Sequence, residues 1–204
     1  MNTVDNQLPF VFRASNISKI QKRNARVDRE FTDNNLNGVD LSSTDLSYIR
    51  LNEAQLINDC LAESDLNWNL LSNNNLEDFD FSNANLSLAI LRGASLKGAN
   101  FCLAILRGTD LQNADLQEAI LSGSILQGAN LRAANLSNAY LLGTNLSHAV
   151  LSNADLTNAH LLGANLSDTN FDGAKLNNAR FGWNTGISEQ MKFELQLRGA
   201  IFED

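Results

Sequence analysis

The most regular feature of the chain is a large hydrophobic residue at every fifth position. Counting from Phe31 in steps of five, Leu or Phe occupies every position as far as Phe181, which makes 31 consecutive positions without an insertion or deletion. Two residues before each of them the chain prefers a small residue, and from Ala84 to Ala179 all 20 such positions hold Ala, Ser or Thr. An internal repeat of fixed period is typical of a solenoid, in which each repeat contacts only its neighbours.

A period of five fits neither a helix nor a strand, whose hydrophobic positions recur about every 3.6 and every 2 residues. It fits a chain that turns a corner every five residues, with the large residue and its small partner inside and three residues outside. Four corners close a coil of about 20 residues, and coils would stack about 4.8 Å apart, like strands in a sheet. Glycines support such corners, because they recur two residues after a Leu or Phe, where a tight turn needs a positive φ. These glycines are Gly93, Gly98, Gly108, Gly123, Gly128, Gly143, Gly163 and Gly173.

The tandem A(D/N)Lxx pattern, as in ADLTNAHLLGANLSDTNFDGAKL at residues 154–176, resembles the pentapeptide repeat family. The resemblance covers residues 31–183. It implies an all-β solenoid, a right-handed quadrilateral β-helix of about eight coils with short helical caps at one or both ends. Many members of this family, which is numerous in cyanobacteria, have no assigned biochemical role, and some act through protein contacts.

The five-residue frame divides the chain into three segments. Residues 1–30 are expected to be an N-terminal basic capping segment, residues 31–183 the pentapeptide-repeat β-helix, and residues 184–204 a C-terminal helical cap. Ser188 can N-cap a helix that Gly199 ends. The alternative for this end is a homodimer, because in some relatives it packs against its own copy.

The N-terminal segment carries six of the 15 basic residues, and a basic amphipathic helix could contact nucleic acid or a membrane. Between Asp33 and Asp80, however, ten acidic residues accompany one basic residue, so an intramolecular cap is favoured. We therefore expect no direct nucleic acid binding and no membrane contact. Without a secretory signal, and with only Cys60 and Cys102 as cysteines, the chain is expected in the cytoplasm.

Residues 20 apart should stack on one face of the rod, which lets the outer surface be mapped from the sequence. One stripe of apolar and aromatic residues stands out as a candidate protein-interaction surface. It consists of Ile120, Tyr140, Leu142, His160 and Leu162. The alternative is that the outer face of a β-ladder simply tolerates such residues. The partner would be an unidentified protein, or a second copy bound through this stripe or the C-terminal cap.

Charged residues offer two further hypotheses. A second candidate surface, able to receive an acidic partner, consists of Arg92, Lys97, Arg107 and Arg132. The alternative is solvated charge beside acids such as Asp110 and Glu118. Some relatives mimic DNA and protect or inhibit type II topoisomerases. The acidic excess of this chain stops after Asp80. We therefore favour a protein-interaction scaffold or regulator and keep DNA mimicry as the alternative function.

Catalytic motifs are lacking in the sequence. His148 and His160 would lie on different faces, and neither has a metal-ligand spacing or a glycine-rich phosphate loop nearby. We expect no enzyme activity, no catalytic residue, no metal and no cofactor. Asp59 and Phe79 replace small inward residues, which predicts a wider and less regular coil at that level.

Overall fold

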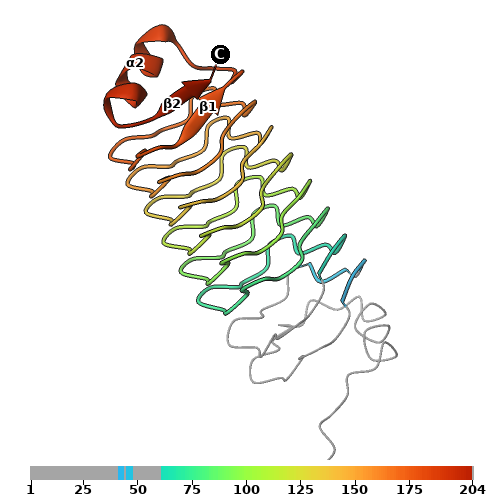
Figure 1. Ribbon diagram of the computed structural model, residues 1–204. Coiled ribbons are helices and arrows are strands. Elements are labelled where there is room, and N and C mark those ends of the chain that lie inside the picture. The colour runs from blue at the N-terminus through green and yellow to red at the C-terminus, as the bar shows by residue number, and fades with distance from the viewer. Residues whose placement is uncertain (1–40, 44, 48–60, 204) are drawn as a thin grey trace, which may run out of the picture.

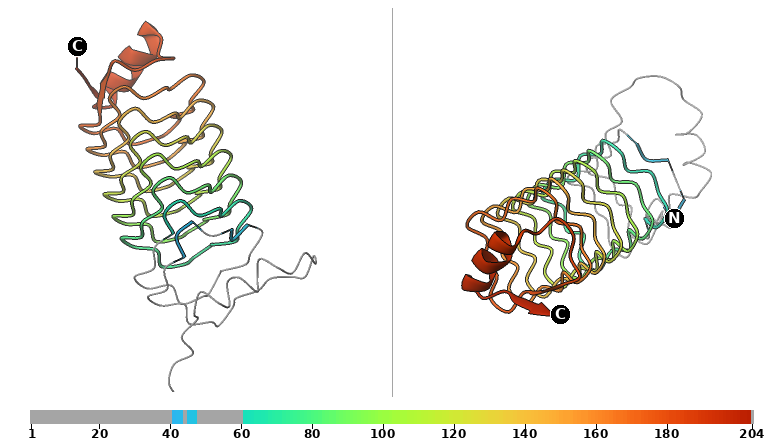
Figure 2. Two further views of the ribbon diagram at one scale, coloured as in Figure 1. Left: turned by 90° about the vertical axis from the view of Figure 1, so that its right-hand side faces the viewer. Right: turned by 90° about the horizontal axis from the view of Figure 1, so that it is seen from above.

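The structure, a computed structural model, describes residues 41–43, 45–47 and 61–203. These residues form a rod of stacked four-sided coils with a cap at its C-terminal end (Figure 1). The cap contains strand β1 (Arg180–Gly182), helix α2 (Glu189–Leu197) and strand β2 (Ile201–Glu203). Seen from the capped end, the coils lie one behind another (Figure 2).

Successive coils pair in parallel, and the bridges within the repeat join residues 20 apart. One such column runs from Asn85 through Ile105 and Ile125 to Asn145. One coil therefore consists of four repeats, as the period of five predicts, and the fold is a right-handed quadrilateral β-helix.

Each corner is a β-turn in which the backbone N–H of the small inward residue donates to the carbonyl oxygen of the Leu or Phe three residues earlier. Ala84 N, for example, lies 3.0 Å from Phe81 O. The second outward residue of the corner has a positive φ at every repeat from Glu63 to Trp183, and φ lies between 60° and 71° at the eight glycines. The prediction for the glycines is confirmed. The same backbone conformation is also imposed on larger residues such as Leu88 and Leu103.

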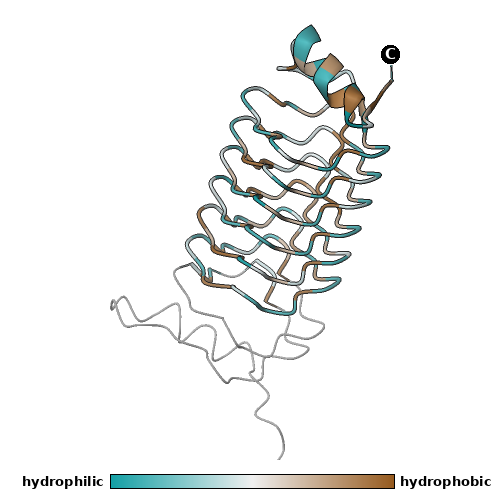
Figure 3. Ribbon diagram, turned by 90° about the vertical axis from the view of Figure 1, so that its left-hand side faces the viewer, coloured by the Kyte–Doolittle hydropathy of each residue, from teal (hydrophilic) through white to brown (hydrophobic). Residues whose placement is uncertain are grey.

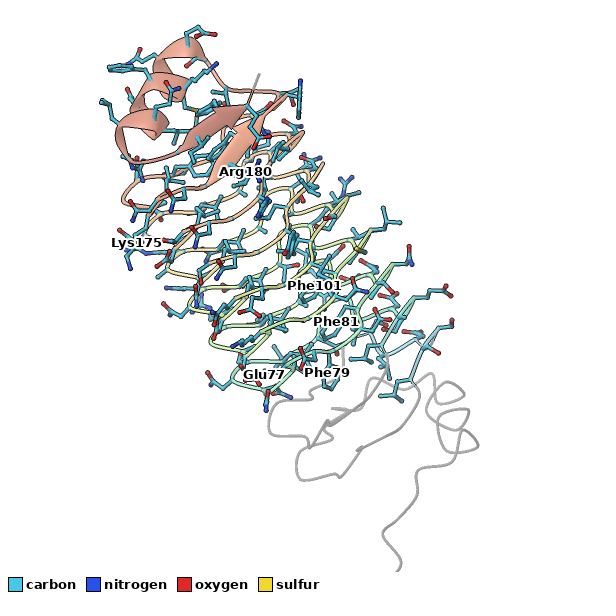
Figure 4. All side chains as sticks on the ribbon, viewed as in Figure 1. Glu77, Phe79, Phe81, Phe101, Lys175 and Arg180 are labelled. Carbon is cyan, nitrogen blue, oxygen red and sulfur yellow. The ribbon has the colours of Figure 1, made fainter. Side chains whose placement is uncertain are left out.

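The interior is filled by the repeated Leu and Phe residues and their small partners, which are buried from Leu61 to Phe181. Phe81 and Phe101 stack with ring centroids 4.9 Å apart and 3° between their planes (Figure 4). Where Thr replaces Ala, its hydroxyl donates to a backbone carbonyl of the preceding coil, as Thr109 Oγ1 does to Leu86 O at 2.8 Å. The hydroxyls of these inward Thr residues therefore have hydrogen-bond acceptors inside the rod, and the regular repeat is kept.

The prediction of a less regular coil around Phe79 is wrong for residues 61–80. These residues keep the turn-and-bridge pattern of later coils. The ring of Phe79 is buried and lies over Phe81, with centroids 5.8 Å apart (Figure 4). Asn69 fits because its Nδ2 donates to Leu46 O at 2.9 Å. Asp59 and the predicted N-terminal cap at residues 1–30 lie outside the described residues.

The C-terminal cap covers the last coil. Ser188 is the N-cap of α2, since its Oγ accepts from Met191 N at 3.1 Å, and Gly199 follows the helix with φ 92°, as predicted. Strand β2 pairs in parallel with β1, and Phe202 continues the inner column by stacking on Phe181. The guanidinium of Arg198 donates to the carbonyl oxygens of Phe171 and Ala174, which ties the end of α2 to the rod.

Candidate protein-interaction surface

The filled interior directs attention to the outside of the rod. Within the described ranges, no three His, Cys, Asp or Glu side chains are grouped so as to hold a metal ion. Nor is any helix in that part of the chain long and apolar enough to cross a membrane. His148 lies with its Nδ1 3.5 Å from Asp168 Oδ2 on an exposed corner.

The predicted apolar stripe forms two adjoining columns. Backbone bridges join Ile120 to Tyr140 and Tyr140 to His160. The rings of Tyr140 and His160 stack, with centroids 5.2 Å apart and 16° between planes. Leu142 and Leu162 follow two residues later along the chain, one coil apart. Tyr140 and Leu142 are 45% and 43% exposed, which leaves much of both side chains open to a partner.

Leu103 and Trp183 extend this surface and were missed from the sequence. They occupy one column of corners, with Gly123, Gly143 and Gly163 between them, and all five have a positive φ. Leu103 is 62% and Trp183 is 69% exposed. A bulky side chain at positive φ is an outlier, and a large apolar side chain in solvent adds a second unfavourable feature. The only signal in the sequence is that Leu103 and Trp183 occupy the second outward position of a corner, where most other repeats have Gly or Asn.

The stripe, the part of this column from Leu103 to Gly163 and the residues beside them surround one edge of the rod, which we call the uncharged face. Its outward residues, taken over four coils, include no Asp, Glu, Lys or Arg. They are Asn100, Cys102, Leu103, Ile105, Ile120, Ser122, Gly123, Ile125, Tyr140, Leu142, Gly143, Asn145, His160, Leu162, Gly163 and Asn165. Hydrophobic segments recur at matching places of successive coils (Figure 3). Absence of charge at the centre of a surface, with apolar and aromatic side chains, is typical of protein interfaces.

The four basic residues of the second candidate surface occupy three neighbouring corners of the rod. Arg92 and Arg132 share a column two coils apart, whereas Lys97 and Arg107 belong to the corners on either side. Arg92 Nε lies 2.5 Å from Asp110 Oδ2, and Arg107 Nη1 donates to Gln127 Oε1 at 3.0 Å. Two of the four thus already have partners on the rod itself.

The cap offers another apolar surface and two clefts. Phe193 and Leu197, one helical turn apart on α2, are 61% and 71% exposed. A cleft of about 460 Å³ lies between α2 and the last coil, and one of about 240 Å³ lies beside Trp183 and Phe202. Lys192 closes over the second, with Nζ 5.2 Å from the Phe202 ring centroid.

The carboxyl of Asp155 has a lowered pKa. Burial alone would raise the pKa, but hydrogen bonds from Thr157 and the ammonium of Lys175 outweigh it, so the pKa lies below its usual value. Lys175 Nζ is 3.1 Å from Asp155 Oδ2, one coil away on the same column (Figure 4 labels Lys175). This pair belongs to a different side of the rod from the uncharged face and serves the stacking of coils.

Comparison with known proteins gives one family match. The family model for pentapeptide repeats, in eight copies, matches residues 64–101, 84–123, 124–161 and 144–182. Among curated proteins, no match is found.

Several solved structures are similar to the chain. QnrB1, a plasmid-mediated fluoroquinolone resistance protein, superposes with a TM-score of 0.59 at 18% identity, over 89% of this chain and 87% of its own. Rfr23 from the cyanobacterium Cyanothece 51142 is 41% identical over 42% of this chain, with a TM-score of 0.42, and the match spans 58% of Rfr23. HetL from Nostoc sp. strain PCC 7120, described as involved in heterocyst differentiation regulation, is 27% identical over 76% of this chain and 88% of its own, with a TM-score of 0.38. Because its identity is so low, the likeness to QnrB1 supports the fold and nothing further.

Proposed function

The chain belongs to the pentapeptide repeat family, and we propose that it is a non-enzymatic scaffold or regulator that binds a protein partner through the uncharged face. The observation that carries this proposal is the absence of Asp, Glu, Lys and Arg from sixteen outward positions around one edge of the rod. Elsewhere on the rod, charged residues recur, as at Asp110, Glu118 and Arg132. Solubility alone would favour charges on every side.

Two exposed apolar corner residues, Leu103 and Trp183, adjoin the same surface. Their positive φ does not single them out, because every repeat from Glu63 to Trp183 has it. A rigid β-helix also holds these side chains in fixed positions, so little conformational entropy is lost when a partner binds.

The test compares two arginine pairs at equivalent corner positions. Leu142→Arg with Leu162→Arg places two charges on the uncharged face, whereas Gln117→Arg with Thr157→Arg places two charges at the same turn position on another side. The tagged proteins are used to capture partners from a native lysate at low and high salt, followed by mass spectrometry. We expect a partner that survives high salt to be lost only with the first pair, at nearly unchanged thermal stability. A partner retained equally by both variants would remove the uncharged face from consideration.

A second candidate function rests on the acidic residues of the first described coils. Asp45, Glu63, Asp65, Glu77, Asp78 and Asp80 lie on outward positions there. A DNA mimic that binds a type II topoisomerase would use such charge, and QnrB1, which has the same fold, is a fluoroquinolone resistance protein. DNA carries charge along its whole length, whereas the acidic excess of this rod is confined to one end. A gyrase supercoiling assay with and without a fluoroquinolone decides between them: protection or inhibition, lost on adding salt, would favour the mimic.

A further inference from the structure

We propose that the capped end of the rod binds an extended peptide segment of a partner protein, which adds one parallel strand to the last coil in the cleft beside α2. The segment has a basic residue between two apolar residues. This site lies at the end of the rod and is separate from the uncharged face, so either proposal can fail without the other.

One side of the last coil ends in a strand edge whose backbone groups have no partner. On the same side of the coil before it, three backbone hydrogen bonds lead to the last coil. They are Asn170 N to Ala149 O at 3.0 Å, Leu151 N to Asn170 O at 2.8 Å and Asn153 N to Asp172 O at 2.8 Å. Twenty residues later the equivalent groups are Thr169 O, Phe171 N and Gly173 N, and within the described residues none of these three makes a hydrogen bond. An added strand would restore the pattern of the earlier coils.

The cap continues the backbone ladder on other sides of the last coil. Strand β2 pairs with β1, and Thr185 pairs with Asn165. The side of Asn170 faces α2 instead, which lies across the end of the rod (Figure 2). The backbone N–H and C=O groups in the middle of a helix pair along its own axis, so α2 cannot complete this edge. An uncovered strand edge is a template for pairing with another chain.

The cleft beside this edge has room for a peptide. It measures about 460 Å³ and lies between residues 168–172 and α2, within the range of about 300–1,000 Å³ that is usual for binding pockets. Part of its wall is apolar, since Phe171 and Leu195 are buried and Met191 packs on the core beside them. In strand addition, main-chain hydrogen bonds provide affinity and alternate side chains provide specificity.

The alternation of side chains along the added strand defines the sequence that fits. The residue paired with Asn170 points outwards, between the corners that hold Asp168 and Asp172. The residues before and after it point inwards, towards the apolar wall formed by Met191 and Leu195. Carboxylates on both sides favour a basic residue at the outward place, and the wall favours apolar residues at the inward places.

The carboxylates of Asp172 and Glu194 are available to such a basic residue. Within residues 61–203, no Lys or Arg forms an ion pair with either of them. Asp172 Oδ2 accepts from Asn170 Nδ2 at 3.2 Å, and Glu194 Oε1 accepts from Gln190 Nε2 at 3.0 Å. Both donors are neutral amides, so the two negative charges are not compensated.

Two basic groups nearby leave this negative charge in place. His148 lies 3.5 Å from Asp168 and carries a charge only when it is protonated. Arg198 lines the cleft, but its guanidinium donates to the carbonyl oxygens of Phe171 and Ala174. Arg198 therefore holds the wall of the cleft, while three carboxylates, those of Asp168, Asp172 and Glu194, remain around it.

Amide hydrogen exchange of the full-length chain, followed by NMR, tests first whether the edge is free. Phe171 and Gly173 should exchange about tenfold faster or more than their equivalents Leu151 and Asn153, whose N–H groups are hydrogen-bonded. Equal protection at all four positions would show that the chain itself occupies the edge, and would overturn the proposal.

Three pools of blocked pentapeptides then test the occupant. All have the pattern Ser-X-Z-X-Ser, in which X is Ala, Val or Leu and Z is Lys, Glu or a lysine methylated on its backbone nitrogen. The Lys pool should slow exchange at Phe171 and Gly173 and leave Leu151 unchanged. The Glu pool is repelled by the carboxylates, and the methylated pool lacks the N–H that donates to Thr169 O, so neither should protect these amides. No protection by the Lys pool, or equal protection by all three, would overturn the proposal.

Neutral variants of the same size test the charge. Asp172→Asn with Glu194→Gln should weaken binding of the Lys pool about three- to tenfold. The matched pair Glu77→Gln with Glu118→Gln removes the same charge from other coils and should leave binding unchanged. Equal weakening by both pairs would reduce the preference to net charge, and NMR shifts confined to the surroundings of Phe193 would place the peptide on the outer side of α2. Either result would overturn the cleft as the binding site.

Discussion

Gly186 packs against the backbone of Ser167 so closely that a Cβ at residue 186 would lie 2.3 Å from Ser167 N. Gly186 also has φ 79°, at the point where the chain leaves the regular coils for the cap. Two separate constraints, conformation and space, therefore fix glycine at this position. Gly143 has the positive φ without the close contact, so the two constraints can be measured separately.

Gly143→Ala isolates the conformational constraint, because its Cβ would meet nothing within 4 Å. We expect a loss of about 1–2 kcal/mol in the free energy of unfolding from the positive φ. Gly186→Ala adds a collision with backbone that cannot move away, so its loss should be clearly larger. Urea unfolding of both variants provides the comparison, and equal losses would show that the cap adjusts freely around residue 186.

Phe101→Ala should be among the most damaging single changes in the rod. The ring is fully buried and stacks on Phe81, so truncation leaves a cavity that the stacked coils cannot close. Cavities of this type cost about 3–5 kcal/mol. Phe101→Leu should cost much less, because Leu fills the equivalent position in most coils. Thermal and urea unfolding of the pair would refute this view if both changes were equally harmful.

Arg198→Met tests how the cap is held. The guanidinium donates to two backbone carbonyls of the last coil, Phe171 O and Ala174 O, which no apolar side chain can replace. Hydrogen bonds to charged groups contribute about 1.5–3 kcal/mol each. We expect faster amide hydrogen exchange in α2 and in the last coil, while the coils around Phe101 stay protected. Uniformly faster exchange along the whole rod would contradict a local role.

Asp155→Asn tests the shifted carboxyl. Its pKa is lower in the folded chain than the value of 3.8 expected after unfolding. The charged form therefore stabilises the fold at pH values above 3.8, and this contribution disappears as the pH falls through the lower folded value. Because Lys175 is largely exposed and Asp155 is partly exposed, solvent screens the pair and the effect should stay below about 1 kcal/mol. Unfolding free energies near neutral pH should differ slightly between wild type and variant and converge in acid; Lys175→Met should show part of the same difference.

The repeat made the fold predictable, because a Leu or Phe every five residues leaves few other ways to bury them. The error at Phe79 has a physical reason. The ring of Phe79 stacks on Phe81 inside the rod, which a rule based on residue size alone does not capture. The cap was predictable at Ser188 from capping chemistry, but the pairing of β2 with β1 depends on a contact between separate segments.

The candidate surface was predictable only in part. A coil of four repeats placed Ile120, Tyr140 and His160 in one column, as the bridges show. Leu103 and Trp183 escaped notice because their position belongs to the turn, where local sequence preference suggests glycine and not a contact. The identity of a partner is not encoded in a surface pattern alone, since one apolar face can fit several proteins.

The pairing of each coil with the coils before and after it also determines how the rod would respond to mechanical force. Pulling on the two ends of the chain would detach one coil at a time, because a coil in a solenoid is held only by its immediate neighbours. Every detached coil would release about 66–72 Å of extended chain, so a force–extension trace should show evenly spaced steps rather than one abrupt rupture. The length of chain released at each step would thus correspond to one coil, that is, to four repeats of five residues.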